Sequence, residues 1–440
     1  MADMDTKVLI GNTSVGSIAI DENSGWHFNY APGWRKNGFS LAPCLPLHAP
    51  SESHAVRNFF ANMLPENDQS LEHLAQALQI SRTNTFGLLL AIRHDLSGAL
   101  HLQTREESPA VTLFRPIEDE EIASKLDNPI NNPIDIWDNR PRLSLAGVQE
   151  KINVLKLNGQ WGLGEGRLCS THILKFDRTD QTSSPRHLVL NEYFSMQLAR
   201  HLGFTVAETE LQQFGSHRAL VVKRFDRQLK QQNNEPAVLR RHLIDTCQAL
   251  GLPVAYKYER PFGDGRDVAD FREGVSLKKL VSLTGHCQSP QDATRNILDW
   301  TLFNLLIGNT DSHGKNYSFF VSKQGLAPTP WYDLLNTMLY QGEINTNLAM
   351  SIGDVFNPEE VHAFQLLSCA TDIGIPAKIL VNRLKPLCAD IINTIHTITS
   401  NIQMNRAEQA FAKRYTIDIL SRCRYFSKES ESILSLKRLL

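Results

Sequence analysis

The spacing of apolar and polar positions divides the chain into four stretches of different character. In residues 1 to 103, the apolar runs VLIG and SIAI predict two short strands, and SLEHLAQALQI has the spacing of an amphipathic helix. FNYAPGW, which contains Pro32 and Gly33, is expected to form a turn. These signals predict a small β-rich subdomain at the N-terminus.

Residues 104 to 141 lack a clear period. The run EDEE is acidic, and NPINNPIDIWDNRPR is rich in proline and asparagine. Such a composition is typical of segments that join domains. We therefore expect a connecting segment here.

Strand signals return between residues 142 and 226. EKINVLKL, QWGL, THILKF and RALVVKRF are short apolar runs, and Asn158 with Gly159 predicts a two-residue hairpin turn between the first two. NEYFSMQLARHLGF has helical spacing and is expected to end at Gly203. GLGEGR lacks the strand, turn and helix context of a dinucleotide-binding loop, so we expect a flexible connection.

From residue 227 to residue 440 the pattern is mainly helical. RNILDWTLFNLLIGN is apolar on nearly all sides, which predicts a helix in the middle of a core. The four stretches together predict an α+β fold, in which a β-rich small lobe precedes a mainly helical large lobe.

Composition narrows the classes of partner. The 440 residues include 45 lysines and arginines against 47 acidic residues, which leaves a formal net charge of -2. Without a general basic field, contact with nucleic acid requires a local patch or a partner protein. No apolar run reaches the roughly 18 residues of a membrane span, and the first residues do not resemble a signal peptide. We expect a cytoplasmic protein without a membrane partner.

The seven cysteines are scattered and form no CxxC pair, which argues against a zinc or redox centre. We expect reduced thiols that are mostly buried. They are Cys44, Cys169, Cys247, Cys287, Cys369, Cys388 and Cys423.

The polar segment GNTDSHGKN, residues 308–316, follows the long apolar stretch. Asp311 and Asn316 have the spacing DxxxxN of a protein-kinase catalytic loop, in which the Asp meets the substrate hydroxyl and the Asn ligates Mg²⁺. The spacing alone favours a simpler interpretation, a helix C-cap followed by a polar turn.

The residues after Asn316 strengthen the catalytic interpretation. YSFFV and LAPTPWYDLLN predict two strands that fold back around residues 323–325. If the strands pair, Asn316 and Asp333 lie side by side. A carboxamide and a carboxylate together suit Mg²⁺, which prefers oxygen ligands, so Asp333 is expected to act as the metal-binding aspartate.

Lys175 lies near the end of the run THILKF, and Glu192 lies near the start of the helix that follows. A strand lysine followed by a helix glutamate is the order in which protein kinases grip nucleotide phosphates, so we predict an ion pair. Each residue also has an ordinary explanation when taken singly. A strand-end lysine can extend to solvent, and an acid can stabilise a helix N-terminus.

The segment SLAGVQEK, from Ser144 to Lys151, is the better candidate for a phosphate loop. Backbone amides at Ala146 and Gly147 can approach phosphate oxygens, and Gln149 and Lys151 supply further donors. Ser144, in the run RLS, is a candidate phosphorylation site.

RALVVKRFDR is expected to be the last strand of the small lobe. In kinase-like folds the chain then crosses to the large lobe, and backbone groups of the crossing meet the adenine edge. Lys223, Arg224 and Phe225 occupy this place in the sequence.

With these residues assembled, the chain resembles the HipA family of bacterial toxin serine/threonine kinases. Similarity to the family's landmarks runs in order through RLSLAGVQEK, THILKF, NEYFSMQLARHLG, VVKRFDR, CQALGLPVAYKYE, IGNTDSHGKNYSFF and WYDLLN. FNYAPGW and FFANMLPEN also look like the family's small first domain. The resemblance implies a two-lobed protein-kinase-like fold and an ATP- and Mg²⁺-dependent protein kinase.

The resemblance also implies roles for individual residues. Asp311 would be catalytic, Asn316 and Asp333 would hold Mg²⁺, and Ser144 matches a serine whose autophosphorylation ejects the phosphate loop. Lys223 is a departure, because an acidic residue is expected at the start of the hinge. The residues expected at the nucleotide site are Ala146, Gly147, Val148, Gln149, Glu150, Lys151, Lys175, Glu192, Lys223, Arg224, Phe225, His313, Gly314, Lys315, Asn316, Tyr332 and Asp333.

The resemblance implies partners too. These are a HipB-like helix-turn-helix antitoxin dimer, operator DNA contacted mainly through that antitoxin, and an aminoacyl-tRNA synthetase, notably the glutamyl enzyme, as protein substrate. Two alternatives remain. One is a small-molecule phosphotransferase of the antibiotic-kinase type, in which a histidine usually precedes the catalytic Asp, whereas His313 follows Asp311. The other is a non-catalytic pseudokinase that serves as corepressor.

Overall fold

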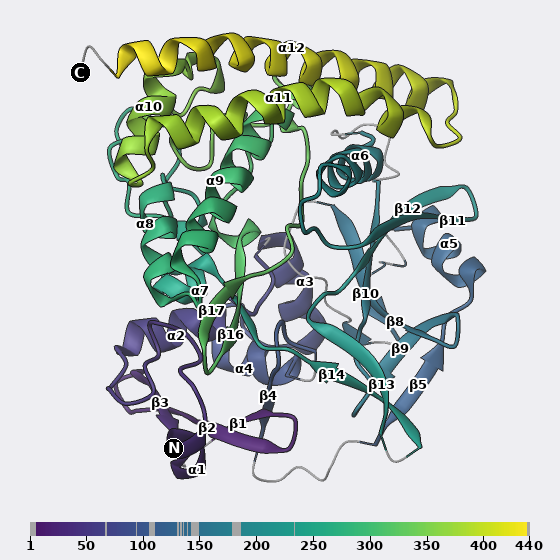
Figure 1. The fold of residues 1–440 in the computed structure, drawn as a ribbon. Coiled ribbons are helices and arrows are strands. Elements are labelled where there is room, and N and C mark those ends of the chain that lie inside the picture. Colours follow the sequence, from purple (N-terminus) through teal and green to yellow (C-terminus); the bar gives the residue numbers. More distant parts are fainter. Residues whose placement is uncertain are drawn as a thin grey trace. The chain divides into compact units, whose positions relative to one another are not determined.

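The computed structural model describes residues 6–437, except 67, 94, 105–110, 130, 131, 133, 135, 139, 142–148, 178–185 and 233. It contains two compact units, each assembled from separate stretches of the chain. Sheets predominate in the first unit and long helices in the second, which confirms the α+β class (Figure 1). The first unit comprises Met1–Asp180, Glu210–Val254 and Ser318–Leu326, and the second comprises Gln181–Thr209, Ala255–Tyr317 and Ala327–Leu440.

The first unit begins with a four-stranded antiparallel sheet. Its strands are β1 (Thr6–Ile10), β2 (Thr13–Ile20), β3 (Trp26–Tyr30) and β4 (Leu100–Gln103), in the order β3-β2-β1-β4. Its helices are α1 (Pro32–Asn37), α2 (Ser53–Ala61), α3 (Asp68–Leu78) and α4 (Thr85–Ala91). The predicted strands and the amphipathic helix are confirmed. The expected turn at Pro32 and Gly33 is wrong, because both residues open α1, where a proline needs no backbone donor.

A six-stranded sheet has the order β11-β12-β10-β8-β9-β5. Its strands are β5 (Leu113–Pro116), β8 (Glu150–Leu157), β9 (Gln160–Glu165), β10 (His172–Phe176), β11 (Thr209–Phe214) and β12 (His217–Lys223). The helix α5 (Asp119–Asp127) and the pair β6 (Ile136–Trp137) and β7 (Arg140–Pro141) precede β8.

The stretch that was expected to connect domains contributes to this sheet. β5 pairs with β9, and Ile122, Leu126 and Trp137 share one apolar core with Ile152 and Leu174 of the central strands. The predicted boundaries after residues 103, 141 and 226 stay predictions.

The glycines around β9 illustrate one correct and one wrong expectation. Asn158 and Gly159 have φ values of 52° and 85°, so they form the predicted left-handed two-residue turn between β8 and β9. The flexible connection expected at GLGEGR is wrong, since Gly162 and Gly164 lie within β9 and pair with β5. A Cβ atom on Gly162 would lie 2.5 Å from the carbonyl oxygen of Arg115, which explains the glycine.

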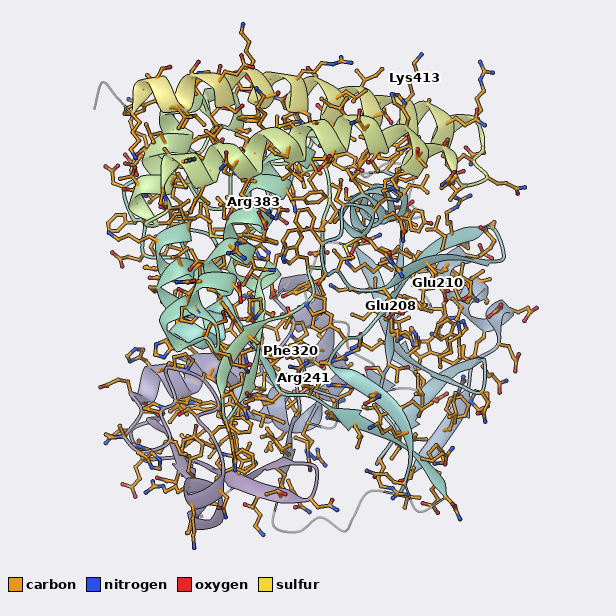
Figure 2. All side chains as sticks on the ribbon, viewed as in Figure 1. Glu208, Glu210, Arg241, Phe320, Arg383 and Lys413 are labelled. Carbon is orange, nitrogen blue, oxygen red and sulfur yellow. The ribbon has the colours of Figure 1, made fainter. Side chains whose placement is uncertain are left out.

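Smaller elements complete the first unit. They are the hairpin β13 (Arg227–Gln232) and β14 (Glu235–Arg240), the helix α7 (Thr246–Leu250), and the sheet β15 (Leu243–Asp245), β16 (Ser318–Ser322) and β17 (Gly325–Pro328). The hairpin predicted around residues 323–325 is confirmed. Arg241 lies over the ring of Phe320 on β16, 3.4 Å from its centre (Figure 2).

Helices dominate the second unit. They are α6 (Leu188–His201), α8 (Leu277–Ser282), α9 (Pro290–Ile307), α10 (Ala363–Asp372), α11 (Ala377–Ser400) and α12 (Arg406–Leu436), with 3₁₀ turns at Val254–Lys257, Leu283–His286, Gly314–Asn316, Thr337–Tyr340 and Pro358–Glu360. The long helices α11 and α12 pack side by side (Figure 1). Arg383 of α11 donates from Nε to Asp299 of α9 at 2.7 Å (Figure 2). The central apolar helix is confirmed, since Ile297, Phe303 and Ile307 are fully buried.

The cysteines behave as expected. All seven are free, and all except the half-buried Cys44 are buried. Within the described residues, no helix combines the length and apolar character that crossing a membrane requires.

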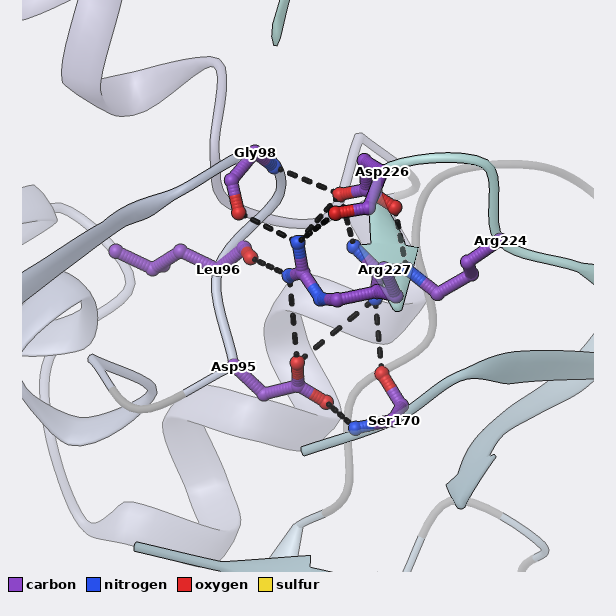
Figure 3. A network of polar contacts seen from close by, with 7 residues as sticks. All are labelled: Asp95, Leu96, Gly98, Ser170, Arg224, Asp226 and Arg227. Carbon is purple, nitrogen blue, oxygen red and sulfur yellow. Dashed lines mark hydrogen bonds and ion pairs between the residues drawn. The ribbon is translucent and has the colours of Figure 1, made fainter. Parts of the chain in front are cut away.

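Three buried charged side chains and the half-exposed Asp95 join separate parts of the first unit (Figure 3). Arg224 donates to both carboxylate oxygens of Asp226, at 3.0 and 2.9 Å, and Arg227 donates to Asp226 Oδ2 at 2.6 Å. Arg227 also donates to the carbonyl oxygens of Leu96 and Gly98, at 2.7 and 2.6 Å. The segment that follows β12 is thereby bonded to the segment that precedes β4.

Asp95 completes this charge network. Its Oδ1 lies 3.8 Å from Arg224 Nη1 and 3.6 Å from Arg227 Nη2, while Ser170 Oγ accepts a 2.9 Å bond from Arg224. Burial would raise the pKa of Asp226, but the adjacent charges of Arg224 and Arg227 outweigh it and bring this pKa to about 2. Two carboxylates thus balance two guanidinium groups that are too buried to be solvated by water.

The substitution Asp226→Asn tests the network. It preserves side-chain shape but leaves two buried guanidinium groups facing an uncharged amide, so we expect a loss of about 3–5 kcal/mol in the free energy of unfolding. Urea unfolding followed by circular dichroism measures it as a lower midpoint.

Glu431→Gln is the control, because its ion pair with Lys385 is exposed and should contribute at most about 1 kcal/mol. Since the folded pKa of Asp226 lies below the unfolded value of about 3.9, its contribution should be complete above about pH 4 and lost as the pH falls toward 2. Equal midpoints for the two variants at pH 7 would contradict the assignment.

Candidate active site

α9 ends in a glycine-capped turn. Gly308 has a φ of 77°, and its N–H donates to the carbonyl oxygens of Asn304 and Leu305. A Cβ atom at this position would lie 2.9 Å from Asn336 Oδ1. The position therefore requires glycine, because the backbone is left-handed and a side chain would collide with its neighbours. The helix C-cap expected in GNTDSHGKN is confirmed, and it lies at the first residue of that segment, Gly308.

The hydroxyl of Thr337 holds the residues that follow. It accepts a 2.7 Å bond from the N–H of Thr310 and donates to the carbonyl oxygen of Gly308 at 3.0 Å. The carbonyl oxygen of Thr310 in turn accepts a 2.8 Å bond from the N–H of Ala349. Both threonines are buried. The backbone immediately before Asp311 is therefore held by both its donor and its acceptor.

Asp311 extends from this anchored backbone with an exposed side chain. Its carbonyl oxygen accepts a 3.0 Å bond from Asn316 Nδ2, which closes the loop. Its carboxylate Oδ1 accepts a 2.8 Å bond from the hydroxyl of Tyr258. An exposed carboxylate on a rigid loop is suited to accept a proton from, or orient, a hydroxyl group that approaches from solvent.

Hydrogen bonds bring the neighbourhoods of Asn316 and Asp333 together. The hydroxyl of Tyr332, next to Asp333, donates to the carbonyl oxygen of Lys315, next to Asn316, at 2.7 Å. A single hydrogen bond thus joins the chain neighbours of Asn316 and Asp333. This is the proximity that the predicted hairpin required.

Asn296 of α9 links the same two segments a second time. Its Oδ1 accepts bonds from the hydroxyl of Tyr317 at 2.7 Å and from Nε1 of Trp331 at 3.1 Å. Both aromatic side chains are buried. A carbonyl oxygen with two lone pairs can accept both bonds, so a single half-buried amide fixes the register between the segments.

The donors at these two positions fit a hard cation. Asn316 uses its Nδ2 atom for Asp311, which turns its amide oxygen away as the atom able to bind metal. Asp333 is half-buried and has a φ of 58°, a conformation that is costly for a residue other than glycine and is often found at functional sites. Within the described residues no group of three or more His, Cys, Asp or Glu side chains could hold a metal. Two oxygen ligands suit Mg²⁺, which takes its remaining ligands from water and phosphate.

In the first unit, Lys151 of β8 lies directly opposite Lys175 of β10 in the antiparallel register. Residues so paired point to the same face, and like charges in this position repel. Both lysines are buried. Close to them, the Gln149 Nε2 donor is buried and has no hydrogen-bond partner among the described residues. Two neighbouring cationic side chains and the unused Gln149 donor are groups that can bind a phosphate chain.

Some of the predicted site residues lie outside the part of the chain that the structure describes. Ala146, Gly147, Val148 and Ser144 lie outside the described residues. Glu192 is buried on α6 in the second unit, whereas Lys175 belongs to the first, so their predicted ion pair stays a prediction.

The predicted hinge residues have distinct surroundings in the first unit. Lys223 ends β12 with an exposed side chain, and Phe225 packs edge-on against Phe320, with ring centres 5.8 Å apart. The N–H of Arg224 donates to the carbonyl oxygen of Thr171 at 2.9 Å, and its guanidinium belongs to the buried charge network. The side chain of Arg224 therefore supports this segment from within.

His313 shapes the loop. Its Nδ1 accepts a 3.3 Å bond from the N–H of Lys315, and its own N–H donates to the carbonyl oxygen of Asp311 at 2.8 Å. A Cβ atom on the next residue, Gly314, would lie 2.5 Å from the side chain of Val275, so the turn packs tightly.

Sequence reasoning missed Tyr258, Asn296 and Thr337. Tyr258 lies in the run VAYKYE, and nothing in its local spacing indicates a contact with a loop more than fifty residues away. Asn296 was partly indicated by the sequence. It lies in a mainly apolar helix, where an amide that is shielded from water needs a hydrogen-bond partner.

Family models match most of the chain. A model described as the HipA N-terminal domain matches residues 6–103, and one described as the HipA-like C-terminal domain matches residues 143–398. The second match alone covers more than half of the 440 residues.

Relatives agree with these models. A serine/threonine-protein kinase toxin HipA of Shewanella oneidensis is 40% identical over 416 residues, or 94% of either chain. A putative kinase of Sinorhizobium fredii is 31% identical and covers 89% of this chain and 92% of its own. The solved Shewanella oneidensis HipA, in complex with HipB and operator DNA, matches with a TM-score of 0.89 and 39% identity over 97% of this chain and 99% of that one. This chain therefore belongs to the HipA family, with the two-lobed kinase-like fold and the serine/threonine protein kinase class of its relatives.

Proposed function

We propose that this protein is the toxin kinase of a HipBA-like toxin–antitoxin module and acts in the cytoplasm. In this proposal it transfers the γ-phosphoryl group of ATP, in the presence of Mg²⁺, to a serine of an aminoacyl-tRNA synthetase, the glutamyl enzyme being the first candidate. The observation that carries the proposal is the double linkage of the segments around Asn316 and Asp333, beside the exposed Asp311.

The proposed roles follow from this geometry. Asp311 receives the acceptor hydroxyl, and the oxygens of Asn316 and Asp333 hold the metal. Lys151 and Lys175 bind phosphates, because an anion relieves the repulsion between two lysines on one face of the sheet. When bound, Mg²⁺ neutralises charge that develops on the transferred group.

The finer nucleotide contacts belong to the same proposal. Tyr332 lies beside Asp333, where its ring can contact the nucleotide while its hydroxyl stays bonded to Lys315. The chain from Lys223 to Phe225 serves as the hinge, and residues Ala146–Val148 form the phosphate loop with Gln149 to Lys151.

Regulation and partners complete the proposal. Phosphorylation of Ser144 would place a dianion in the loop meant for the phosphates of ATP, so repulsion would switch the kinase off. The proposed antitoxin is a HipB-like helix-turn-helix dimer, with which the chain serves as corepressor on operator DNA. The solved complex of the relative, which contains HipA, HipB and operator DNA, supports this part of the proposal. The formal net charge of -2 agrees with DNA contact made mainly by the antitoxin.

The alternatives are weaker. A purely non-catalytic corepressor needs neither a hydrogen-bonded, exposed Asp311 nor Asp333 in a costly backbone conformation. A small-molecule phosphotransferase is disfavoured because His313 follows the aspartate and is used to shape its loop.

The first test is Asp311→Asn. We expect it to lower the rate of phosphate transfer by at least about a hundredfold and to abolish growth arrest on expression, because an amide does not accept the hydroxyl proton. Phosphate incorporation measured by intact-mass spectrometry and growth after induction report the two effects.

Asp372→Asn is the matched control, since Asp372 is an exposed aspartate at the end of α10. Antitoxin binding and the melting temperature should be unchanged in both variants. An Asp311→Asn variant that remains toxic would show that Asp311 has been given the wrong role.

Autophosphorylation provides a second test. With ATP and Mg²⁺ the purified chain should gain the mass of a single phosphate, located on Ser144 by peptide mapping. Ser144→Ala should show no gain and should retain transfer to its protein substrate. A phosphate on another residue would reject the proposed switch.

The lysine pair provides a third test. Lys175→Met and Lys151→Met should each weaken ATP binding by about tenfold, because each removes one charge facing the phosphates. The rise in melting temperature that ATP produces should shrink accordingly. Lys156→Met is the control, since Lys156 is on the same strand as Lys151 but its ammonium lies over the ring of Trp161. Equal ATP-induced shifts in all three variants would count against the phosphate site.

A further inference from the structure

The side chain of Tyr258 contacts the candidate catalytic loop at two points. Its hydroxyl donates to Asp311 Oδ1 at 2.8 Å. Its ring meets that of His313 edge-on, with centres 5.2 Å apart and planes at 88°. Within the described residues, no other hydrogen bond reaches the Asp311 carboxylate.

The backbone holds Tyr258 and Asp311 at a set separation. The N–H of Glu259, the residue after Tyr258, donates to the carbonyl oxygen of Ala349 at 2.9 Å. The N–H of Ala349 donates to the carbonyl oxygen of Thr310, the residue before Asp311, at 2.8 Å. One residue therefore joins the chain neighbours of the phenol and of the carboxylate.

The segment that carries Tyr258 is itself anchored. The buried carboxylate of Glu259 accepts bonds from Arg272 Nε at 2.7 Å and from the N–H of Ser351 at 2.8 Å. A Cβ atom on Gly274 would lie 1.7 Å from the carbonyl oxygen of Tyr258, so the segments around these two residues are closely packed. The backbone from which the phenol extends is therefore held in place on several sides.

This arrangement suits a device that orients a carboxylate. A side chain on an exposed loop rotates about its terminal torsion, and only some of its rotations point a lone pair at an approaching hydroxyl. The bond from Tyr258 engages Oδ1, so Oδ2 is the carboxylate oxygen available to an acceptor hydroxyl. In phosphoryl transfer, catalysis comes mainly from positioning and electrostatics, so such orientation affects the rate directly.

We propose that Tyr258 is a positioning residue for phosphoryl transfer, which sets the orientation of the Asp311 carboxylate toward the acceptor hydroxyl. The inference rests on the proposed function, because it assigns Tyr258 a part in the reaction of that site. It adds a residue to the acceptor side, distinct from the groups proposed for ATP and Mg²⁺.

The test compares Tyr258→Phe with Tyr256→Phe. The two changes remove the same atom from the same segment, but the ring of Tyr256 packs on Phe262, with centres 6.1 Å apart. Autophosphorylation is followed by intact-mass spectrometry over a range of Mg²⁺–ATP concentrations. This yields a maximal rate and the ATP concentration at half that rate.

Tyr258→Phe should lower the maximal rate by about tenfold to a hundredfold. The half-saturating ATP concentration and the melting temperature should stay within the range of the wild type, which a merely structural role would not predict. Tyr256→Phe should behave as the wild type in all three measurements.

The possible outcomes distinguish a failure of the proposed function from a failure of the role proposed for Tyr258. A wild-type chain that gains no phosphate would overturn the proposed function, and this inference with it. An active wild type with equal rates for the two variants would overturn only the role of Tyr258. A loss that appears as weaker ATP binding or a lower melting temperature would also overturn it.

Discussion

The buried hydroxyl of Thr337 ties the loop that follows α9 to the segment that follows Asp333. It accepts from the N–H of Thr310 and donates to the carbonyl oxygen of Gly308, so it satisfies backbone groups left over at a helix end. Because the bonded groups of Gly308 and Thr310 lie just before Asp311, the backbone that carries the exposed Asp311 side chain is held in place. The bond that Tyr332 donates and the two bonds that Asn296 accepts then connect the segments of Asn316 and Asp333 to the same loop.

The first unit uses charge in two contrasting ways. Arg224 and Arg227 are balanced by Asp95 and Asp226, which makes their burial tolerable and stiffens the segment proposed as the hinge. Lys151 and Lys175 lie directly opposite each other on neighbouring strands and carry charges of the same sign. The first arrangement supports the fold from within, whereas the second is suited to a ligand that brings negative charge.

Much of the fold could be predicted from local pattern. The strands and helices with clear apolar spacing, the turn at Asn158 and Gly159, and the cap at Gly308 formed where expected, because each depends on burial periodicity or on left-handed backbone. The errors share a cause. Pro32 and the glycines of β9 were interpreted as breakers, but a proline fits a helix start and a glycine fits where a neighbouring strand comes close.

For the candidate site, the sequence by itself determined which chemical groups are present and their order, namely an aspartate, an amide and a second aspartate at the ends of apolar elements. It also carried the family resemblance. Only the tertiary structure decided that Lys315 is bonded to Tyr332, that Asn296 bridges Tyr317 and Trp331, and that Tyr258 meets Asp311. The physical reason is that spacing reports periodic burial along one element, whereas these bonds join residues far apart in the chain whose proximity depends on how several elements pack.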